Sequence, residues 1–158
     1  CFTWGVTAIG GTHVCLRKFE PSEVWPLVEQ ENVTHFNGAP VVMIALLNEA
    51  NRPQKLSRRL TITTAGAPPS PTLIENLQAM GAEVIHIYGL TETYGPYTIC
   101  APQQDWAEKS PAQQGTLLAR QGVAYIMSEP IRVVDEDMND VPRNGESLGE
   151  VVMTGNNV

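Results

Sequence analysis

The chain has 158 residues, a length that fits one ordinary domain with a sizeable hydrophobic core. Its formal net charge is −7, from 10 Lys and Arg residues against 17 Asp and Glu residues, and no basic stripe is present. An acidic chain without a basic groove is a poor ligand for nucleic acid. The longest uncharged apolar run, near residues 41–47, is too short to span a bilayer. We therefore expect no nucleic-acid partner and no transmembrane segment, and no pattern specifies an oligomeric state.

The three cysteines, Cys1, Cys15 and Cys100, are widely spaced and form no CxxC pair. No His lies near a Cys at metal-ligand spacing, which argues against a zinc site or a disulfide framework. We therefore expect a reducing intracellular compartment, and these residues do not distinguish a cytoplasmic from a peroxisomal location. The chain starts at Cys1 and stops just after an apolar run, so we expect an internal piece of a longer protein.

Hydrophobic patterning predicts alternating strands and helices through the first two thirds of the chain. In chain order we expect a strand at 12–16, a helix at 21–31, a strand at 33–36, a helix at 40–51, a strand at 60–64, a helix at 71–81 and a strand at 83–88. The helix at 71–81 is the best marked, because Ser70 caps it, Pro71 takes its first position and Gly81 ends it.

After residue 102 the sequence becomes polar and proline-containing. A helical turn is expected at 116–120, followed by two strands at 131–135 and 148–153 that turn residues separate. The order predicts an α/β fold with a mostly parallel sheet and helices on both faces, followed by the start of a small β-rich subdomain. We place the α/β part at residues 1–105, and the linker with the beginning of the β subdomain at residues 106–158.

Two loops follow predicted strands and could hold a ligand, because open α/β sheets bind ligands at the carboxyl ends of their strands. The first is 63–69 and the second is 88–96. In the second loop Tyr88 offers a flat face for a base, and Glu92 offers a hard oxygen for Mg²⁺. Its threonines, Thr91 and Thr93, offer hydroxyls for phosphate oxygens. The alternative is a capped turn, which Thr91 starts and in which Glu92 favours the helix dipole.

Residues 88–92, Tyr-Gly-Leu-Thr-Glu, resemble the Y-G-x-T-E signature of the adenylate-forming superfamily. This superfamily contains acyl-CoA synthetases, peptide-synthetase adenylation domains and luciferases. Residues 66–69 resemble its G-A-P motif, residues 149–155 resemble its later G-E-apolar strand, and residues 36–40 are similar to the segment that begins a pocket-lining helix. Together with the extended loop at 88–100, these matches are most similar to the acyl-activating type of acyl-CoA synthetase, and they cover nearly the whole chain.

The resemblance implies a nucleotide site. Tyr88 would stack on adenine, while Gly66, Ala67 and Pro68 would pass along the other side of the adenosine. His86 would lie near the adenine amino group, with a buried strand histidine that has a local partner as the alternative. Thr91 would contact the phosphate.

The resemblance also implies a metal ligand and an acyl pocket. Glu92 would hold Mg²⁺, so Thr91 and Glu92 are the expected catalytic residues. Gly89 would border the nucleotide and, with Leu90, the carboxylate and acyl chain. The acyl-pocket residues would also include Asn37 and Gly38, for which a plain role at a helix start is the alternative.

The implied reaction joins a carboxylic acid, fatty or aromatic, to coenzyme A. The acid attacks ATP to give an acyl-adenylate and pyrophosphate, and the thiol of coenzyme A then displaces AMP. Three parts of the family pattern are absent from the chain: the phosphate loop of the form S-G-T-T-G-x-P-K, the ribose-binding aspartate, and the C-terminal domain with its catalytic lysine. We therefore assign the activity to a longer parent protein and expect this chain alone to be inactive. The alternatives are a non-catalytic truncated fragment, or an adenylation domain that loads a carrier protein.

Overall fold

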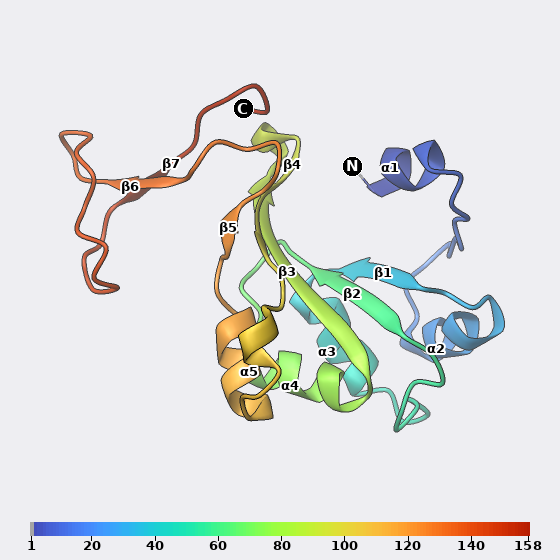
Figure 1. Ribbon diagram of the computed structural model, residues 1–158. Helices are drawn as coiled ribbons and strands as arrows, with labels where there is room; N and C mark the ends of the chain where they lie inside the picture. The colour runs from blue at the N-terminus through green and yellow to red at the C-terminus, as the bar shows by residue number, and fades with distance from the viewer. Residues whose placement is uncertain (1) are drawn as a thin grey trace.

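A five-stranded sheet forms the centre of the computed structural model, which describes residues 2–158 (Figure 1). In spatial order its strands are β1 (His35–Gly38), β2 (Leu60–Thr64), β3 (Ala82–Leu90), β4 (Gly95–Cys100) and β5 (Val123–Ala124). β1, β2 and β3 are parallel, β4 is antiparallel to β3, and β5 is antiparallel to β4. Four of the five strands therefore point the same way, and the predicted α/β class with a mostly parallel sheet is confirmed.

The helices that pack on this sheet share a proline at their first turn, where the missing N–H costs nothing. They are α2 (Pro21–Gln30), α3 (Pro40–Leu47), α4 (Pro71–Ala79) and α5 (Pro111–Leu118). Their buried side chains meet in one core with alternate residues of β2 and β3, such as Ile62 and Val84. The indole Nε1 of Trp25 donates to the carbonyl oxygen of Leu46 at 3.0 Å, which ties α2 to α3. All four helices therefore cover a single face, whereas we had expected them to be divided between two faces.

α4 forms as the sequence predicts. The backbone N–H of Leu73 donates to Ser70 Oγ at 3.2 Å, and Gly81 takes a φ of 95° just beyond the end of the helix. A side-chain cap and a left-handed glycine are local signals, so they identify the ends of this helix without knowledge of the fold.

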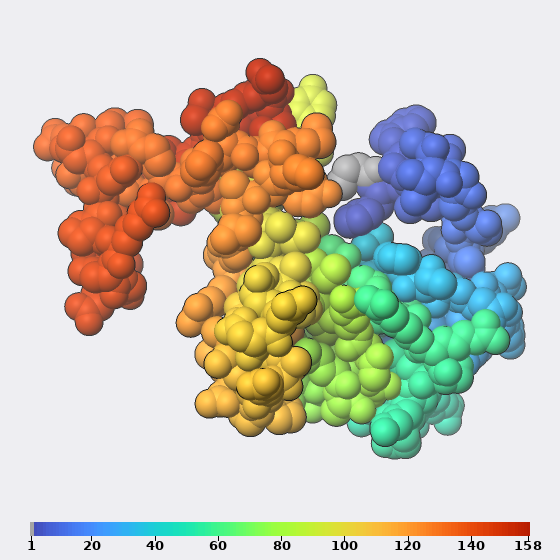
Figure 2. Space-filling view, viewed as in Figure 1, coloured from blue at the N-terminus to red at the C-terminus, as the bar shows by residue number. Residues whose placement is uncertain are grey.

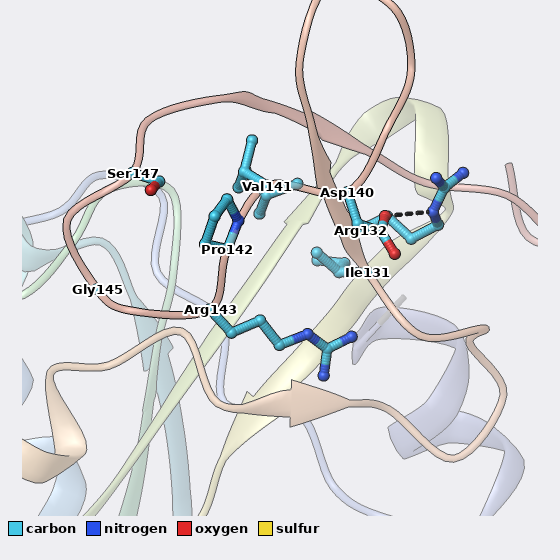
Figure 3. A pocket seen from close by; sticks show the side chains of 9 residues that line it. Ile131, Arg132, Asp140, Val141, Pro142, Arg143, Gly145 and Ser147 are labelled. Carbon is cyan, nitrogen blue, oxygen red and sulfur yellow. Dashed lines mark hydrogen bonds and ion pairs between the residues drawn. The ribbon is translucent and has the colours of Figure 1, made fainter.

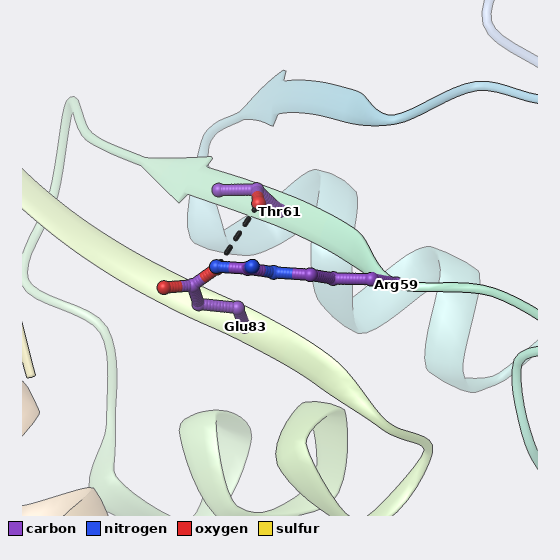
Figure 4. Close-up of polar contacts among 3 residues, drawn as sticks. All are labelled: Arg59, Thr61 and Glu83. Carbon is purple, nitrogen blue, oxygen red and sulfur yellow. Dashed lines mark hydrogen bonds and ion pairs between the residues drawn. The ribbon is translucent and has the colours of Figure 1, made fainter.

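The opposite face of the sheet carries a polar row near the amino ends of the strands (Figure 4). Arg59 Nε donates to Glu83 Oε2 at 3.0 Å, and the hydroxyl of Thr61 donates to the same oxygen at 3.2 Å. The hydrogen bond from the Arg59 guanidinium is the main reason that the pKa of Glu83 is lowered. At the amino ends of its strands this face is therefore held by exposed polar contacts.

Several predicted elements are wrong or shorter than expected. Residues 12–16 form no strand, because Val14 and Leu16 are exposed and have no neighbouring strand. The helix expected at 40–51 ends at Leu47, and the turn expected at 116–120 belongs to α5. The extended loop expected at 88–100 is a hairpin of β3 and β4. The additional helix α1 (Phe2–Ala8) has no buried residue.

The end of the described chain forms a separate lobe, which projects from the α/β body (Figure 2). It contains the two-stranded antiparallel sheet of β6 (Arg132–Val134) and β7 (Glu150–Val152), close to the strands expected there. The five-stranded sheet itself extends to β5, and the division at residue 105 stays a prediction. Among residues 2–158, no helix has the length and apolar character needed to cross a membrane.

Candidate functional site

The carboxyl ends of the three parallel strands bring the expected site residues to one edge of the sheet. The register places Gly38, Thr64 and His86 side by side on β1, β2 and β3. The segment 66–68 follows β2 at this edge, and a Cβ built on Gly66 would lie 4.0 Å from that of Ala39 at the start of α3. Three parts of the chain that strand order and the family resemblance link therefore converge in space.

The signature residues form a tight hairpin. β3 runs to Leu90, the 3-10 helix η1 (Thr91–Thr93) follows, and β4 returns antiparallel. Tyr94 adopts a left-handed conformation with a φ of 57°, and the sheet register is irregular at Tyr88 and Gly89. Thr91 and Glu92 are exposed at the tip of this hairpin, where a ligand can reach them.

Gly89 leaves no room for a side chain against the facing strand of the hairpin. A Cβ at this position would lie 2.0 Å from the carbonyl oxygen of Gly95 and 3.0 Å from the backbone nitrogen of Tyr97. No side chain fits there, so glycine is required by backbone packing whether or not a ligand is bound.

Thr93 holds the turn together from inside. It is 3% exposed, and its hydroxyl accepts from the N–H of Leu90 at 3.0 Å and lies 2.9 Å from the carbonyl oxygen of Gly95. From the sequence this hydroxyl is a candidate ligand for a phosphate oxygen, but in the structure it is hydrogen-bonded to the backbone of the turn. Thr91 is the threonine of the turn that is free to face solvent.

We expect Thr93→Val to lower the free energy of unfolding by about 1–3 kcal/mol, because it leaves the part-buried N–H of Leu90 and carbonyl of Gly95 without this partner. Thr93→Ser keeps the hydroxyl and should lose less. Denaturant unfolding of the three proteins measures the difference. Thr116→Val is the control, since the Thr116 hydroxyl bonds to Ala112 on an exposed helix face. Equal losses at both positions would contradict a special role for Thr93.

His86 lies on the helix-covered face of β3 and is 2% exposed. Its Nδ1 lies 2.8 Å from the carbonyl oxygen of Arg120, so Nδ1 carries the proton in this bond. Burial lowers the pKa of His86, and the bond to the carbonyl partly opposes this. This environment matches the alternative stated above, a buried strand histidine with a local partner.

Stability should therefore fall on acidification. A lowered pKa in the folded state means that the unfolded chain binds the proton first, so the free energy of unfolding decreases as the pH falls below about 6.5. The decrease should reach at most about 1.4 kcal/mol per pH unit and level off below the folded pKa. We expect His86→Asn, whose amide can still donate to Arg120, to flatten the profile between pH 5 and 7 in denaturant titrations. An unchanged profile in the variant would assign the pH dependence to other groups.

The remaining expected residues differ in how they lie. Tyr88 is half-buried and lies opposite Thr98 of β4, while Leu90 is exposed. Asn37 is exposed at the end of β1. A Cβ at Gly38 would lie 3.0 Å from the Met43 side chain, so this glycine also permits close packing at the start of α3.

Glu92 is the one expected metal ligand. It takes part in none of the ion pairs found within residues 2–158. The same residues contain no group of three or more His, Cys, Asp or Glu side chains that could hold a metal. Mg²⁺ commonly binds through one or two carboxylates together with substrate phosphates and water. A single exposed carboxylate therefore fits an ion that arrives with a nucleotide, and not a permanent metal centre.

A cavity of about 310 Å³ lies in the β6–β7 lobe, away from the hairpin (Figure 3). On its wall Arg132 Nε donates to Asp140 Oδ1 at 2.7 Å, and Arg143 extends beside Pro142. None of the expected site residues lines it.

Comparisons with known proteins bear on the family of this chain and on its fold. The sequence model of the AMP-binding enzyme family matches residues 1–158. An acetate–CoA ligase of Humulus lupulus is 44% identical over all of this chain and 28% of its own length. A 4-hydroxybutyrate–CoA ligase of Metallosphaera sedula is 41% identical over 99% of this chain and 29% of its own length. The chain thus spans less than a third of these relatives.

Solved structures share the fold. The o-succinylbenzoate CoA synthetase of Bacillus subtilis, in complex with its acyl-adenylate intermediate, superposes with a TM-score of 0.77 over 98% of this chain and 29% of that one, at 23% identity. A benzoate CoA ligase of Burkholderia xenovorans gives a TM-score of 0.75 over 92% of this chain and 28% of that one, at 19% identity. The family match over the whole chain confirms the resemblance to the adenylate-forming superfamily, and the chain therefore belongs to the AMP-binding enzyme family.

Proposed function

We propose that the protein containing this chain is an ATP-dependent acid–thiol ligase. It activates a carboxylic acid with ATP to give an acyl-adenylate and pyrophosphate, and it transfers the acyl group to coenzyme A with release of AMP. The curated relatives named above are CoA ligases, which supports this reaction class. Because they act on small aliphatic acids by name, we favour a short or medium acid, with an aromatic acid as the alternative.

The observation that carries the proposal is the exposed Thr91–Glu92 pair at the tip of a hairpin whose backbone is fixed. Attack of a carboxylate on the α-phosphate requires the stabilisation of negative charge and accurate positioning, with little covalent help from protein. A hydroxyl and a carboxylate on a rigid turn meet that need. Mg²⁺, held by Glu92 and the phosphates, would neutralise the developing charge on pyrophosphate.

The other proposed binding residues lie along the same edge of the sheet. Tyr88 stacks on adenine and the Gly66–Pro68 segment lies on its other side. Gly89 and Leu90 border the acyl group, and Asn37 with Gly38 closes the pocket from β1. We place His86 near adenine. Because its side chain is buried, its role there is indirect, through the hydrogen bond to the carbonyl oxygen of Arg120.

The activity needs parts that this chain does not contain, so we propose that residues 1–158 alone are inactive. We assign residues 1–105 to the α/β part of the AMP-binding domain and residues 106–158 to the linker and the β subdomain. A cytoplasmic or peroxisomal location is proposed, because three of the relatives from Arabidopsis thaliana are named as peroxisomal.

Acid-dependent exchange of labelled pyrophosphate into ATP by the full-length protein tests the proposal. Acetate, butyrate, 4-hydroxybutyrate and benzoate form the first panel, each assayed with and without Mg²⁺. Thioester formation is then followed by mass spectrometry with coenzyme A as the acceptor. Exchange without thioester would favour a carrier protein as the acceptor, and no exchange with any acid would favour a non-catalytic protein.

A further inference from the structure

Two segments that carry family motifs meet at one buried phenol. Tyr97 of β4 is 0% exposed, and its hydroxyl donates to the carbonyl oxygen of Thr154 at 2.7 Å. The same hydroxyl accepts from the N–H of Thr154 at 3.2 Å. Both backbone groups of a residue that lies 57 positions along the chain are thus bound by one side chain.

The backbone of Tyr97 is itself fixed on two sides. Its nitrogen lies at the close approach to Gly89, and its carbonyl oxygen accepts from the N–H of Tyr125 at 2.8 Å. The phenol therefore extends from the returning strand of the hairpin that carries Thr91 and Glu92. A displacement of Thr154 would break two hydrogen bonds to a buried side chain.

The segment 154–157 is held along its length as well. Asn157 Nδ2 donates to Ser128 Oγ at 3.2 Å, and a Cβ on Gly155 would lie 3.2 Å from Glu129 Cγ. In Figure 1 the C-terminal end of the chain accordingly lies beside the tip of β4. The segment after β7 is thus placed next to the candidate site, although the β6–β7 lobe projects away from it.

We propose that Tyr97 is a positioning residue for the nucleotide: its hydroxyl holds segment 154–157 as one wall of the site that the Thr91–Glu92 turn forms on the other side. This inference rests on the proposed ligase function. It assigns the hydrogen bonds between Tyr97 and Thr154 to nucleotide binding and not to binding of the acid or the thiol. The reason is that Tyr97 lies on β4, the strand that follows Glu92.

Tyr97→Phe in the full-length protein removes the hydroxyl and keeps the ring. We expect the KM for ATP to rise about five- to tenfold, while kcat and the KM for the acid change less than about twofold. Hydrogen exchange at the Thr154 amide should become faster in the variant. The Kd for AMP, measured by calorimetry, should rise by the same factor as the KM.

Trp25→Phe is the matched control, because it also removes one buried aromatic donor from a backbone carbonyl, at α2 and α3. We expect it to lower stability and to leave the KM for ATP unchanged. An unchanged KM and Kd in Tyr97→Phe, or equal changes in both variants, would overturn the positioning role while leaving the ligase function standing. A wild-type protein that binds no ATP or AMP would overturn both.

Discussion

Replacing Gly89 with alanine is expected to abolish acid-dependent pyrophosphate exchange by the full-length protein. The new methyl group would lie 2.0 Å from the carbonyl oxygen of Gly95, which is far too close for a non-bonded carbon and oxygen. β3 and β4 would have to separate at the point from which the Thr91–Glu92 turn projects. A shift of about 1 Å in catalytic groups can cost about 100-fold in rate, so we expect at least that loss.

Gly5→Ala is the matched control for this substitution. Gly5 lies in α1, and a Cβ there would meet nothing within 4 Å. Alanine is favoured over glycine in a helix by about 1 kcal/mol, so this variant should keep full activity. Activity of Gly89→Ala within about threefold of wild type would contradict the required close approach, since the hairpin could then relax without displacing its tip.

Replacing Glu92 with glutamine is expected to lower the rate of adenylate formation by about 100-fold or more, because it removes the charge of the proposed metal ligand where negative charge develops. The midpoint of thermal unfolding should stay close to that of wild type, since Glu92 is exposed and takes part in none of the ion pairs found within residues 2–158. Raising the Mg²⁺ concentration should restore part of the lost rate.

Glu136→Gln provides the comparison, because Glu136 is an exposed acid in a turn of the β6–β7 lobe. It loses the same charge far from the hairpin. Equal exchange rates in Glu92→Gln and wild type would reject the metal-ligand role, and a rate loss shared by both variants would indicate an effect of net charge.

The parts of the fold that were predicted correctly, such as the ends of α4, are those marked by local sequence signals. Ser70, Pro71 and Gly81 mark α4 through a cap, a preset φ and a left-handed end, none of which needs a distant partner. The edge of the sheet that holds the candidate site followed from strand order and from the family resemblance. The strand expected at 12–16 was wrong, because an apolar run becomes a strand only where another strand pairs with it.

The features that the sequence did not predict depend on tertiary contacts. Gly95 and Pro96 suggested a loop, yet they begin β4, because pairing with β3 outweighs local preference. Burial of the Thr93 hydroxyl follows from the closure of that hairpin and has no sequence signal of its own. The bond between Tyr97 and Thr154 joins residues too distant for any spacing rule.

The exposed apolar side chains of α3 affect the tendency of the protein to self-associate in solution. Val41 and Ile44 on this helix are 70% and 48% exposed, and Ile126 and Leu148 elsewhere are more than 90% exposed. Exposed apolar side chains favour concentration-dependent self-association, which the repulsion from a net charge of −7 opposes less as salt screens it. We therefore expect this polypeptide to stay dispersed better in dilute, low-salt buffers than at high ionic strength.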